Sequence, residues 1–256
     1  MKKELDIKIY KTAEEICEYV LKTFEIRYTA NGMVKTLGRL GYSYKKATSI
    51  PGKMDISKQE SFVELYESNY KKISTDEKVY FVDGCHPTYN NHIGYGWIRT
   101  GATGNFVIKS PTGRERINLL GAYSQKEGES IVFDYKKLNQ HTVVDFLNKL
   151  RSLNGDKKIH FICDNASYLH AKLVRAEAEK LNIHIVYLPS YSPNLNLIER
   201  YWGFMKKYVL RNCYYETFDY FKSAILEFCK NKSDEIKEKL LKYIPEKFHL
   251  IKPMLT

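Results

Sequence analysis

The stretch Leu188–Lys207, LPSYSPNLNLIERYWGFMKK, joins a turn to an amphipathic helix and places one carboxylate, Glu199, in the first turn of that helix. Ser192-Pro193 disfavours a helical backbone at Ser192, and the neighbouring Tyr, Ser and Asn residues are typical of turns. Apolar side chains then recur at helical spacing, at Ile198, Trp202, Met205 and Val209. Glu199 lies one residue off this apolar stripe, at the border between core and solvent. Taken alone, an acid in a first turn is also what the helix dipole favours.

Two earlier carboxylates end short apolar runs: Asp83 ends VYFVD and Asp164 ends IHFICD. Both runs are typical of buried strands, and ligand sites in α/β sheets lie at the carboxyl ends of strands. A single Asp at a strand end is more often a turn or cap residue. Two such Asp residues with a Glu from a nearby helix form an oxygen-donor set suited to Mg²⁺. Because crowded carboxylates repel one another, the cluster needs a cation or a proton, and we expect Asp83, Asp164 and Glu199 to hold divalent metal.

The rest of this region predicts an α/β domain with five strands, the first three forming an antiparallel meander. The further strands and helices are expected at 117–123, 130–135, 139–150, 157–164, 168–181 and 184–188, with a helical tail from 217. Asp134 is a rival carboxylate that we expect to face solvent. Trp97, in the short segment 94–99, is expected to pack against the core.

Residues 1–50 predict a small basic helical unit. Thr12 and Glu15 form a capping-box pattern for a helix that ends near residue 24, and a second helix is expected at 30–40. Lys35 and Arg39 lie on the basic side of the second helix, and Lys45 and Lys46 extend it. This arrangement is typical of a helix-turn-helix unit that reads DNA with its second helix, although short helix pairs have many other uses. Residues 51–76 are expected to form a linker and connector helix, and residues 77–256 the main domain.

The composition favours a nucleic-acid partner and a reducing compartment. The net charge is +11 and the pI is near 9.2, which indicates an anionic partner unless it reflects only a basic background. The five cysteines include no C-x-x-C pair, which argues against a disulfide framework or a zinc site and for the cytoplasm. No stretch has the length and apolarity of a membrane span, and no membrane partner is expected.

Three motifs resemble the catalytic signatures of mariner-like insertion-sequence transposases: VYFVDGCHP, FICDNAS and LPSYSPNLNLIERYW. This family belongs to the D-D-E group, and the 34 residues between Asp164 and Glu199 match the spacing that the group favours. The family usually has Pro at the position of Leu197, and often His at the position of Leu169, next to His170. The resemblance covers about 78–218 well and the N-terminal part more loosely.

The resemblance implies a ribonuclease-H-like mixed five-stranded sheet flanked by helices, preceded by the helix-turn-helix-like unit. It also implies a DNA endonuclease that transposes a mobile element by cutting at its ends and joining them to target DNA. In this hypothesis Asp83 bridges two Mg²⁺ ions, for which Mn²⁺ is a possible substitute, with Asp164 on one ion and Glu199 on the other. His86 either touches a metal-bound water or a phosphate, or is a turn residue, and Asn165 orients Asp164 or contacts the DNA backbone.

Four basic residues of the helix that carries Glu199 are expected to contact phosphates, unless they only form a solvated face: Arg200, Lys206, Lys207 and Arg211. The expected partner is double-stranded DNA, both terminal inverted repeats and target, bound by a homodimer in the nucleoid of a prokaryotic cytoplasm. The family usually carries two helical units before its core, and we expect this chain to carry the second of them. Two alternatives remain: a ribonuclease-H-like nuclease or resolvase that cuts without rejoining, and a non-catalytic DNA-binding remnant of a transposase.

Overall fold

A computed structural model of the chain describes residues 1–46, 52–90, 92–99, 107–111, 115–231, 233–248 and 250. These residues form two compact units, one containing Met1–Gly52 and the other Lys53–Leu250. Each unit has its own hydrophobic core, so each is described by itself. No helix in the described residues combines the length and the hydropathy required to cross a membrane.

The N-terminal unit consists of three helices, α1 (Lys2–Leu5), α2 (Ala13–Phe24) and α3 (Ala30–Arg39). The Thr12 hydroxyl caps α2 by accepting from the backbone N–H of Glu15 at 3.3 Å, as the capping pattern predicts. The helices pack through Ile16, Val20 and Met33. Phe24, at the end of α2, is 45% exposed, because the chain leaves the helix before this side chain can reach the core.

The larger unit contains a mixed five-stranded sheet, as the resemblance implied, and the strands lie in the order β3-β2-β1-β4-β5. Strand β2 (Asn118–Ser124) runs antiparallel to both β1 (Glu77–Cys85) and β3 (Glu129–Tyr135). Strand β4 (Lys158–Cys163) runs parallel to β1, and β5 (Ile183–Tyr187) runs parallel to β4. The antiparallel meander and the parallel pair therefore meet at β1.

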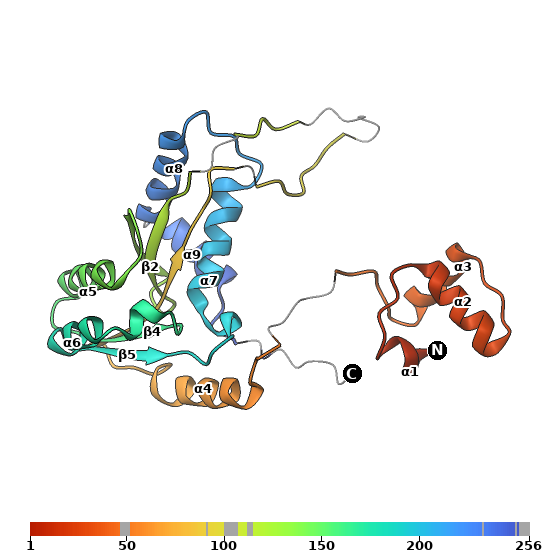
Figure 1. Ribbon diagram of the computed structural model, residues 1–256, viewed down its shortest axis with the longest axis horizontal. Helices are drawn as coiled ribbons and strands as arrows, with labels where there is room; N and C mark the ends of the chain where they lie inside the picture. The colour runs from red at the N-terminus through yellow and green to blue at the C-terminus, as the bar shows by residue number, and fades with distance from the viewer. Residues whose placement is uncertain are drawn as a thin grey trace. The chain divides into compact units, whose positions relative to one another are not determined.

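Helices cover both faces of this sheet (Figure 1). On one face lie α5 (Gln140–Asn154) and α6 (Lys172–Lys180). The other face carries α4 (Ile56–Asn69), α7 (Leu197–Met205), α8 (Phe218–Lys230) and α9 (Asp234–Tyr243). Alternate residues of β1 point to the two faces, so that Phe81 packs toward α7 and Val82 toward α5.

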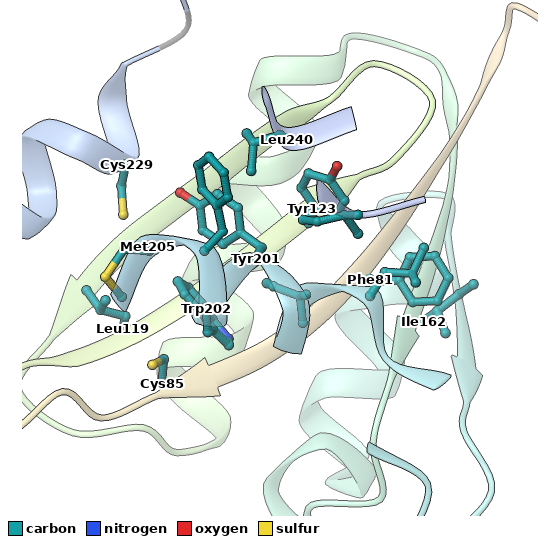
Figure 2. Close-up of a cluster of buried hydrophobic side chains, with 14 of the residues drawn as sticks. Phe81, Cys85, Leu119, Tyr123, Ile162, Tyr201, Trp202, Met205, Cys229 and Leu240 are labelled. Atoms are coloured by element: carbon teal, nitrogen blue, oxygen red, sulfur yellow. The ribbon is translucent and has the colours of Figure 1, made fainter. Parts of the chain in front are cut away.

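The core under α7 combines large aromatic rings with aliphatic and sulfur-containing side chains (Figure 2). Trp202 and Tyr201 from α7 are 1% exposed, and Tyr201 stacks on Tyr123 of β2 with ring centroids 5.7 Å apart. Close packing of large rings gives a rigid interface, since a ring in such a core cannot move without displacing its neighbours. The helix that carries Glu199 is therefore held firmly against the sheet.

Helix α4 packs as part of the larger unit, whereas the sequence assigned it to a connector between domains. Its side chains Phe62 and Tyr66 are buried, and the ring centroids of Tyr66 and of Phe81 in β1 are 5.6 Å apart. The aromatic residues one turn apart form an apolar face that the sheet covers. Residues 51–76 thus include a helix that belongs to the core.

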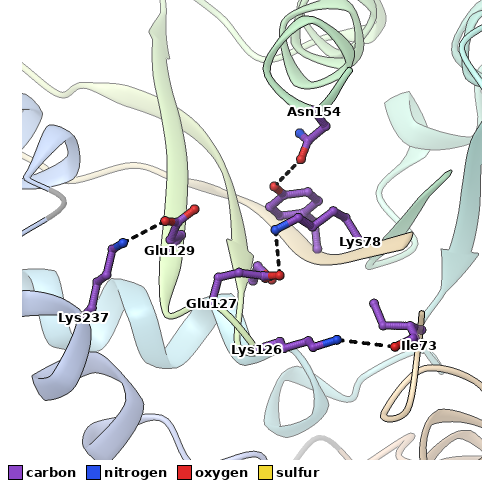
Figure 3. A network of polar contacts seen from close by, with 9 residues as sticks. Ile73, Lys78, Lys126, Glu127, Glu129, Asn154 and Lys237 are labelled. Carbon is purple, nitrogen blue, oxygen red and sulfur yellow. Dashed lines mark hydrogen bonds and ion pairs between the residues drawn. The ribbon is translucent and has the colours of Figure 1, made fainter. Parts of the chain in front are cut away.

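Ion pairs close the end of the sheet where β1 begins (Figure 3). Lys78 Nζ lies 2.6 Å from Glu127 Oε1, and Lys237 Nζ of α9 lies 3.0 Å from Glu129 Oε1. These contacts tie the turn between β2 and β3 to β1 and α9. They leave the opposite end of β1, where Asp83 lies, as the open end of the sheet.

The prediction that Trp97 packs against the core is wrong. Residues 92–99 form neither helix nor strand, and the Trp97 side chain is fully exposed. The segment is attached at one end, where the N–H of Gly94 donates to Asn212 Oδ1 at 2.8 Å. Tyr95 in the same segment is also fully exposed, and aromatic residues on a segment without regular structure have no shared apolar face that could pack on the core.

Candidate active site

Asp83 lies on β1, on the face that α7 covers. The strand continues for two residues beyond the predicted end, and pairs Asp83 with Gly121 and Cys85 with Leu119 of β2. Asp83 is partly buried, and the backbone N–H of Gly84 donates to its carboxylate. Its place inside a ladder gives Asp83 a more rigid backbone than a strand end would.

Asp164 and Glu199 approach from two different elements. Asp164 follows β4 directly, and its Oδ1 accepts from the N–H of Ala166 at 3.1 Å, which forms the turn after the strand. Glu199 lies in the first turn of α7. Both side chains are exposed, so solvent and a large substrate can reach them.

The three carboxylates line one cavity of about 420 Å³. Its other walls come from the segment after β4, the segment after β5 and the start of α7: Asn165, Ala166, Leu188, Pro189, Ser190, Tyr191, Ser192, Pro193 and Asn196. The structure thus brings together residues that are separated by more than 100 positions in the chain. Asp134, the rival carboxylate, is exposed on β3 and does not line this cavity. Its Oδ2 lies 2.7 Å from Lys222 Nζ in an ion pair.

The charges in the cavity strongly perturb Asp83. Burial, followed by the negative charges of Glu199 and Asp164, raises the pKa of Asp83 to about 8. The Asp83 and Glu199 carboxyl groups are close enough to share a hydrogen bond when one of them is protonated. A site that resists ionisation at neutral pH is one that a cation would stabilise.

The donor set of this cavity fits a hard divalent cation. Carboxylate and amide oxygens are the ligands that Mg²⁺ takes in proteins, and Asn196 adds an amide oxygen, Oδ1, that is buried without a hydrogen-bond partner. Among the described residues, no three His, Cys, Asp or Glu side chains have the geometry of an assembled metal site.

Asn165 and His86, the two supporting residues expected from the sequence, lie in different places. Asn165 lines the cavity, donates from Nδ2 to the carbonyl of Leu188 at 2.6 Å and shares Oδ1 with His170 Nε2 at 3.1 Å. This ties the turn after β4 to the end of β5. His86 is exposed and its Nδ1 lies 2.8 Å from Asn118 Oδ1, and it is not among the residues that line the described cavity.

The guanidinium of Arg200 is used within the protein. It donates to the backbone carbonyls of Pro245 at 3.1 Å and Lys247 at 2.9 Å, and to that of Asn194 at 3.5 Å. Burial lowers the pKa of Arg200 from its ordinary value. These contacts give Arg200 a role in anchoring the C-terminal segment to α7, and we omit it from the DNA contacts proposed below.

The other basic residues of this region lie beyond the end of α7. Lys207 and Arg211 are exposed and Lys206 is half-buried. Lys207 Nζ lies over the ring of Tyr243, 5.4 Å from its centroid. In the N-terminal unit Lys35, Arg39, Lys45 and Lys46 are all exposed.

The sequence reasoning missed Asn196, which lines the cavity and is 3% exposed. Its Nδ2 donates to the carbonyl of Val82, the residue before Asp83, at 3.2 Å. The only signal in the sequence is an Asn immediately before a helix, which normally predicts a capping residue. A second missed contact is Gln59 of α4, which is buried and donates to Ser192 Oγ in the cavity wall at 2.9 Å.

Comparison with known proteins gives two family matches. A model of the DDE superfamily endonucleases matches residues 78–222, and a model of winged helix-turn-helix domains matches residues 10–66. A search of curated protein sequences found no match. The first family match contains Asp83, Asp164 and Glu199 and extends over more than half of the chain.

Several solved structures share the fold. The Mos1 transposase paired-end complex with the left transposon end has a TM-score of 0.72 and 18% sequence identity, over 96% of this chain and 74% of that chain. The Mos1 strand transfer complex has a TM-score of 0.69 and 19% sequence identity, and the match covers 96% of this chain and 73% of that chain. The Mos1 catalytic domain with raltegravir and Mn has a TM-score of 0.54 and 17% sequence identity, and the match covers 78% of this chain and 93% of that chain. The ribonuclease-H-like fold expected from the motifs is confirmed, and the chain belongs to the DDE superfamily of endonucleases.

Proposed function

We propose that this chain is a transposase that cuts DNA at the ends of a mobile element and joins those ends to target DNA. The observation that carries this proposal is the single cavity that contains Asp83, Asp164 and Glu199 on a ribonuclease-H-like sheet. Membership of an endonuclease family and a net charge of +11 support an anionic phosphodiester substrate. The similar fold of Mos1 transposase, whose structures include a paired-end complex and a strand transfer complex, supports joining as well as cutting.

Asp83, Asp164 and Glu199 would together hold two divalent cations, Mg²⁺ or Mn²⁺. When bound, such cations activate an attacking oxygen and stabilise the leaving oxygen of an in-line displacement. Asp83 would lose its proton when the cations bind, because its buried carboxylate is costly to ionise without a cation. Asn165 orients the turn that carries Asp164 by holding the Leu188 carbonyl.

DNA recognition would be divided between the two units. Helix α3 presents the exposed Lys35 and Arg39 for the element ends, followed by Lys45 and Lys46. Lys206, Lys207 and Arg211 would contact phosphates near the cavity, and His86 is retained only as a residue at its margin. Two copies of the chain would bind the two element ends, in a prokaryotic cytoplasm that is consistent with five free cysteines.

The test is cleavage of DNA that carries the inverted repeats flanking the gene. Asp83→Asn, Asp164→Asn and Glu199→Gln should each lower Mg²⁺-dependent cleavage by about 100-fold or more, since each removes a charge that holds the cations. Asp134→Asn is the matched control, because it neutralises an exposed acid of the same sheet outside the cavity. Near-normal cleavage by one of the three variants would remove that residue from the site.

The products distinguish the remaining functions. Element ends joined to a target plasmid indicate a transposase, whereas cut ends that are never joined indicate a nuclease or resolvase. Specific binding of the repeats without cleavage in Mg²⁺ or Mn²⁺ would identify a DNA-binding remnant and contradict the proposal.

A further inference from the structure

Gly121 lies directly opposite Asp83 in the ladder between β1 and β2, on the face against which α7 packs. A Cβ at this position would lie 2.6 Å from Cη2 and 2.8 Å from Cζ2 of Trp202, and 3.2 Å from Cδ1 of Ile198. Real Cβ atoms essentially never approach other atoms within 3.0 Å. The absence of a side chain at Gly121 therefore lets α7 rest on the strand backbone immediately beside Asp83.

The Trp202 ring cannot simply turn away from an added methyl group. It is 1% exposed and packs edge-to-face on Tyr201, with ring centroids 5.2 Å apart, in the cluster that also holds Leu119 and Met205 (Figure 2). In a close-packed core, such a ring moves only with the element that carries it. The two side chains that touch Gly121, those of Ile198 and Trp202, flank Glu199 on α7, so their displacement would move Glu199.

Asn196 provides a second link between α7 and β1. An Asn at the N-cap of a helix normally accepts a hydrogen bond from the N–H groups of the first turn. Here the Asn196 side chain makes no such bond, and its Nδ2 donates instead to the carbonyl of Val82 at 3.2 Å. Its own carbonyl accepts from the N–H of Glu199 at 3.1 Å. The residue before Asp83 and the backbone of Glu199 are thus joined through one residue, by its side chain on one side and its backbone carbonyl on the other.

We infer that Gly121 and Asn196 are positioning residues, which set the separation between the Asp83 and Glu199 carboxylates by docking α7 on β1 and β2. This inference rests on the proposed function, because the separation matters for cations held between these acids. Gly121→Ala places the new Cβ about 0.8 Å inside the 3.4 Å limit of ordinary van der Waals contact with Trp202. A misplacement of about 1 Å in a catalytic group can lower the rate by about 100-fold.

The experiment compares Gly121→Ala with Gly203→Ala. Gly203 is on α7 next to Trp202, and a Cβ there would meet only Tyr243 Oη, at 4.0 Å. Both changes are made in Trp97→Phe protein, where Trp202 is the single tryptophan and its emission reports the docking of α7. The second readout is the MgCl₂ concentration that gives half of the maximal rise in melting temperature, and the third is cleavage.

Gly121→Ala should shift the Trp202 emission to the red, raise the half-maximal MgCl₂ concentration about tenfold and lower cleavage about 100-fold. Gly203→Ala should leave the emission and the MgCl₂ response as in the parent. Asn196→Ala should raise the half-maximal MgCl₂ concentration by several-fold, since it removes one hydrogen bond without filling any space. A role in stability alone would lower the melting temperature without changing the MgCl₂ concentration required.

A compensating change makes the inference stricter. Trp202→Phe removes both ring carbons that a Cβ at position 121 would strike, so adding Gly121→Ala to Trp202→Phe should cost little in MgCl₂ response or cleavage. This pair also decides the matter if Gly121→Ala alone does not fold. The inference is overturned if Gly121→Ala matches Gly203→Ala, or if Trp202→Phe fails to relieve it. If the parent protein never cuts DNA, the proposed function fails, while the emission and MgCl₂ comparisons still report on docking.

Discussion

Replacing Asp83 by Asn should stabilise the metal-free protein at neutral pH while it abolishes cleavage. The unfolded chain ionises this carboxyl near its ordinary pKa of 3.8, whereas burial and the charges of Glu199 and Asp164 raise the pKa in the folded protein to about 8. At pH 7.5 the folded protein must therefore keep a proton that the unfolded chain releases. At about 1.36 kcal/mol per pH unit, this costs at most about 5 kcal/mol.

We expect a net gain of about 2 kcal/mol for Asp83→Asn, because part of the cost arises from Glu199, which stays in the cavity of the variant. For a unit of this size, that gain raises the melting temperature by about 4–8 °C. The size of this gain depends on pH, while its sign stays the same. Below pH 4 both states are protonated and the gain vanishes, between pH 4 and 8 it grows as the wild type loses stability, and above pH 8 it is constant.

The assay is thermal unfolding in EDTA from pH 4 to 9, with Asp134→Asn as the control. That control removes only an exposed ion pair, so it should change stability by less than about 1 kcal/mol throughout. Mg²⁺ should reverse the order of the two proteins, since a ligand at 100 times its Kd stabilises the folded wild type by about 2.7 kcal/mol. A difference that does not vary with pH, or a lower melting temperature for Asp83→Asn in EDTA at pH 8, would refute the reasoning.

Three further predictions concern the framework around the site. Burial lowers the pKa of His160 in the folded protein, so protonation of this side chain favours the unfolded chain as the pH falls below 6.5. His160→Gln should therefore reduce the fall in melting temperature between pH 6.5 and pH 5, as thermal unfolding would show. Gly128 has φ +61°, and a Cβ there would lie 3.0–3.3 Å from Leu241 and Lys237 of α9, so Gly128→Ala should cost about 2 kcal/mol in urea unfolding. Arg200→Gln should cost about 2 kcal/mol, by loss of charged hydrogen bonds to backbone carbonyls, and should speed limited proteolysis near Pro245.

The local elements followed closely from the sequence, because their causes are local. The helical spacing of Ile198, Trp202 and Met205 predicted α7, and the short apolar runs predicted β1 and β4. The predicted helix 168–181 is in fact a 3-10 turn, Ser167–His170, followed by α6. Stacking of His170 on Tyr187, with ring centroids 4.0 Å apart, favours this break, and periodicity within one segment cannot reveal such a contact.

Other differences have the same origin. The aromatic side chains of α4 were visible in the sequence, but their burial depends on Phe81 in a strand that follows later in the chain. Trp97 looked like a core residue by type and proved to be exposed, since burial needs a partner surface as well as an apolar side chain.

The sequence by itself predicted which three acids would form the site and in which elements they lie. Asp83, Asp164 and Glu199 were found from strand and helix patterns and from motif spacing, which are properties of short segments. Only the tertiary structure decided that the three acids share one cavity, that Asp83 is the one driven toward neutrality, and that Gly121 and Asn196 hold α7 in place. The reason is that burial, charge interaction and steric contact join residues far apart in the chain, and these exist only once β1, β2 and α7 have packed together.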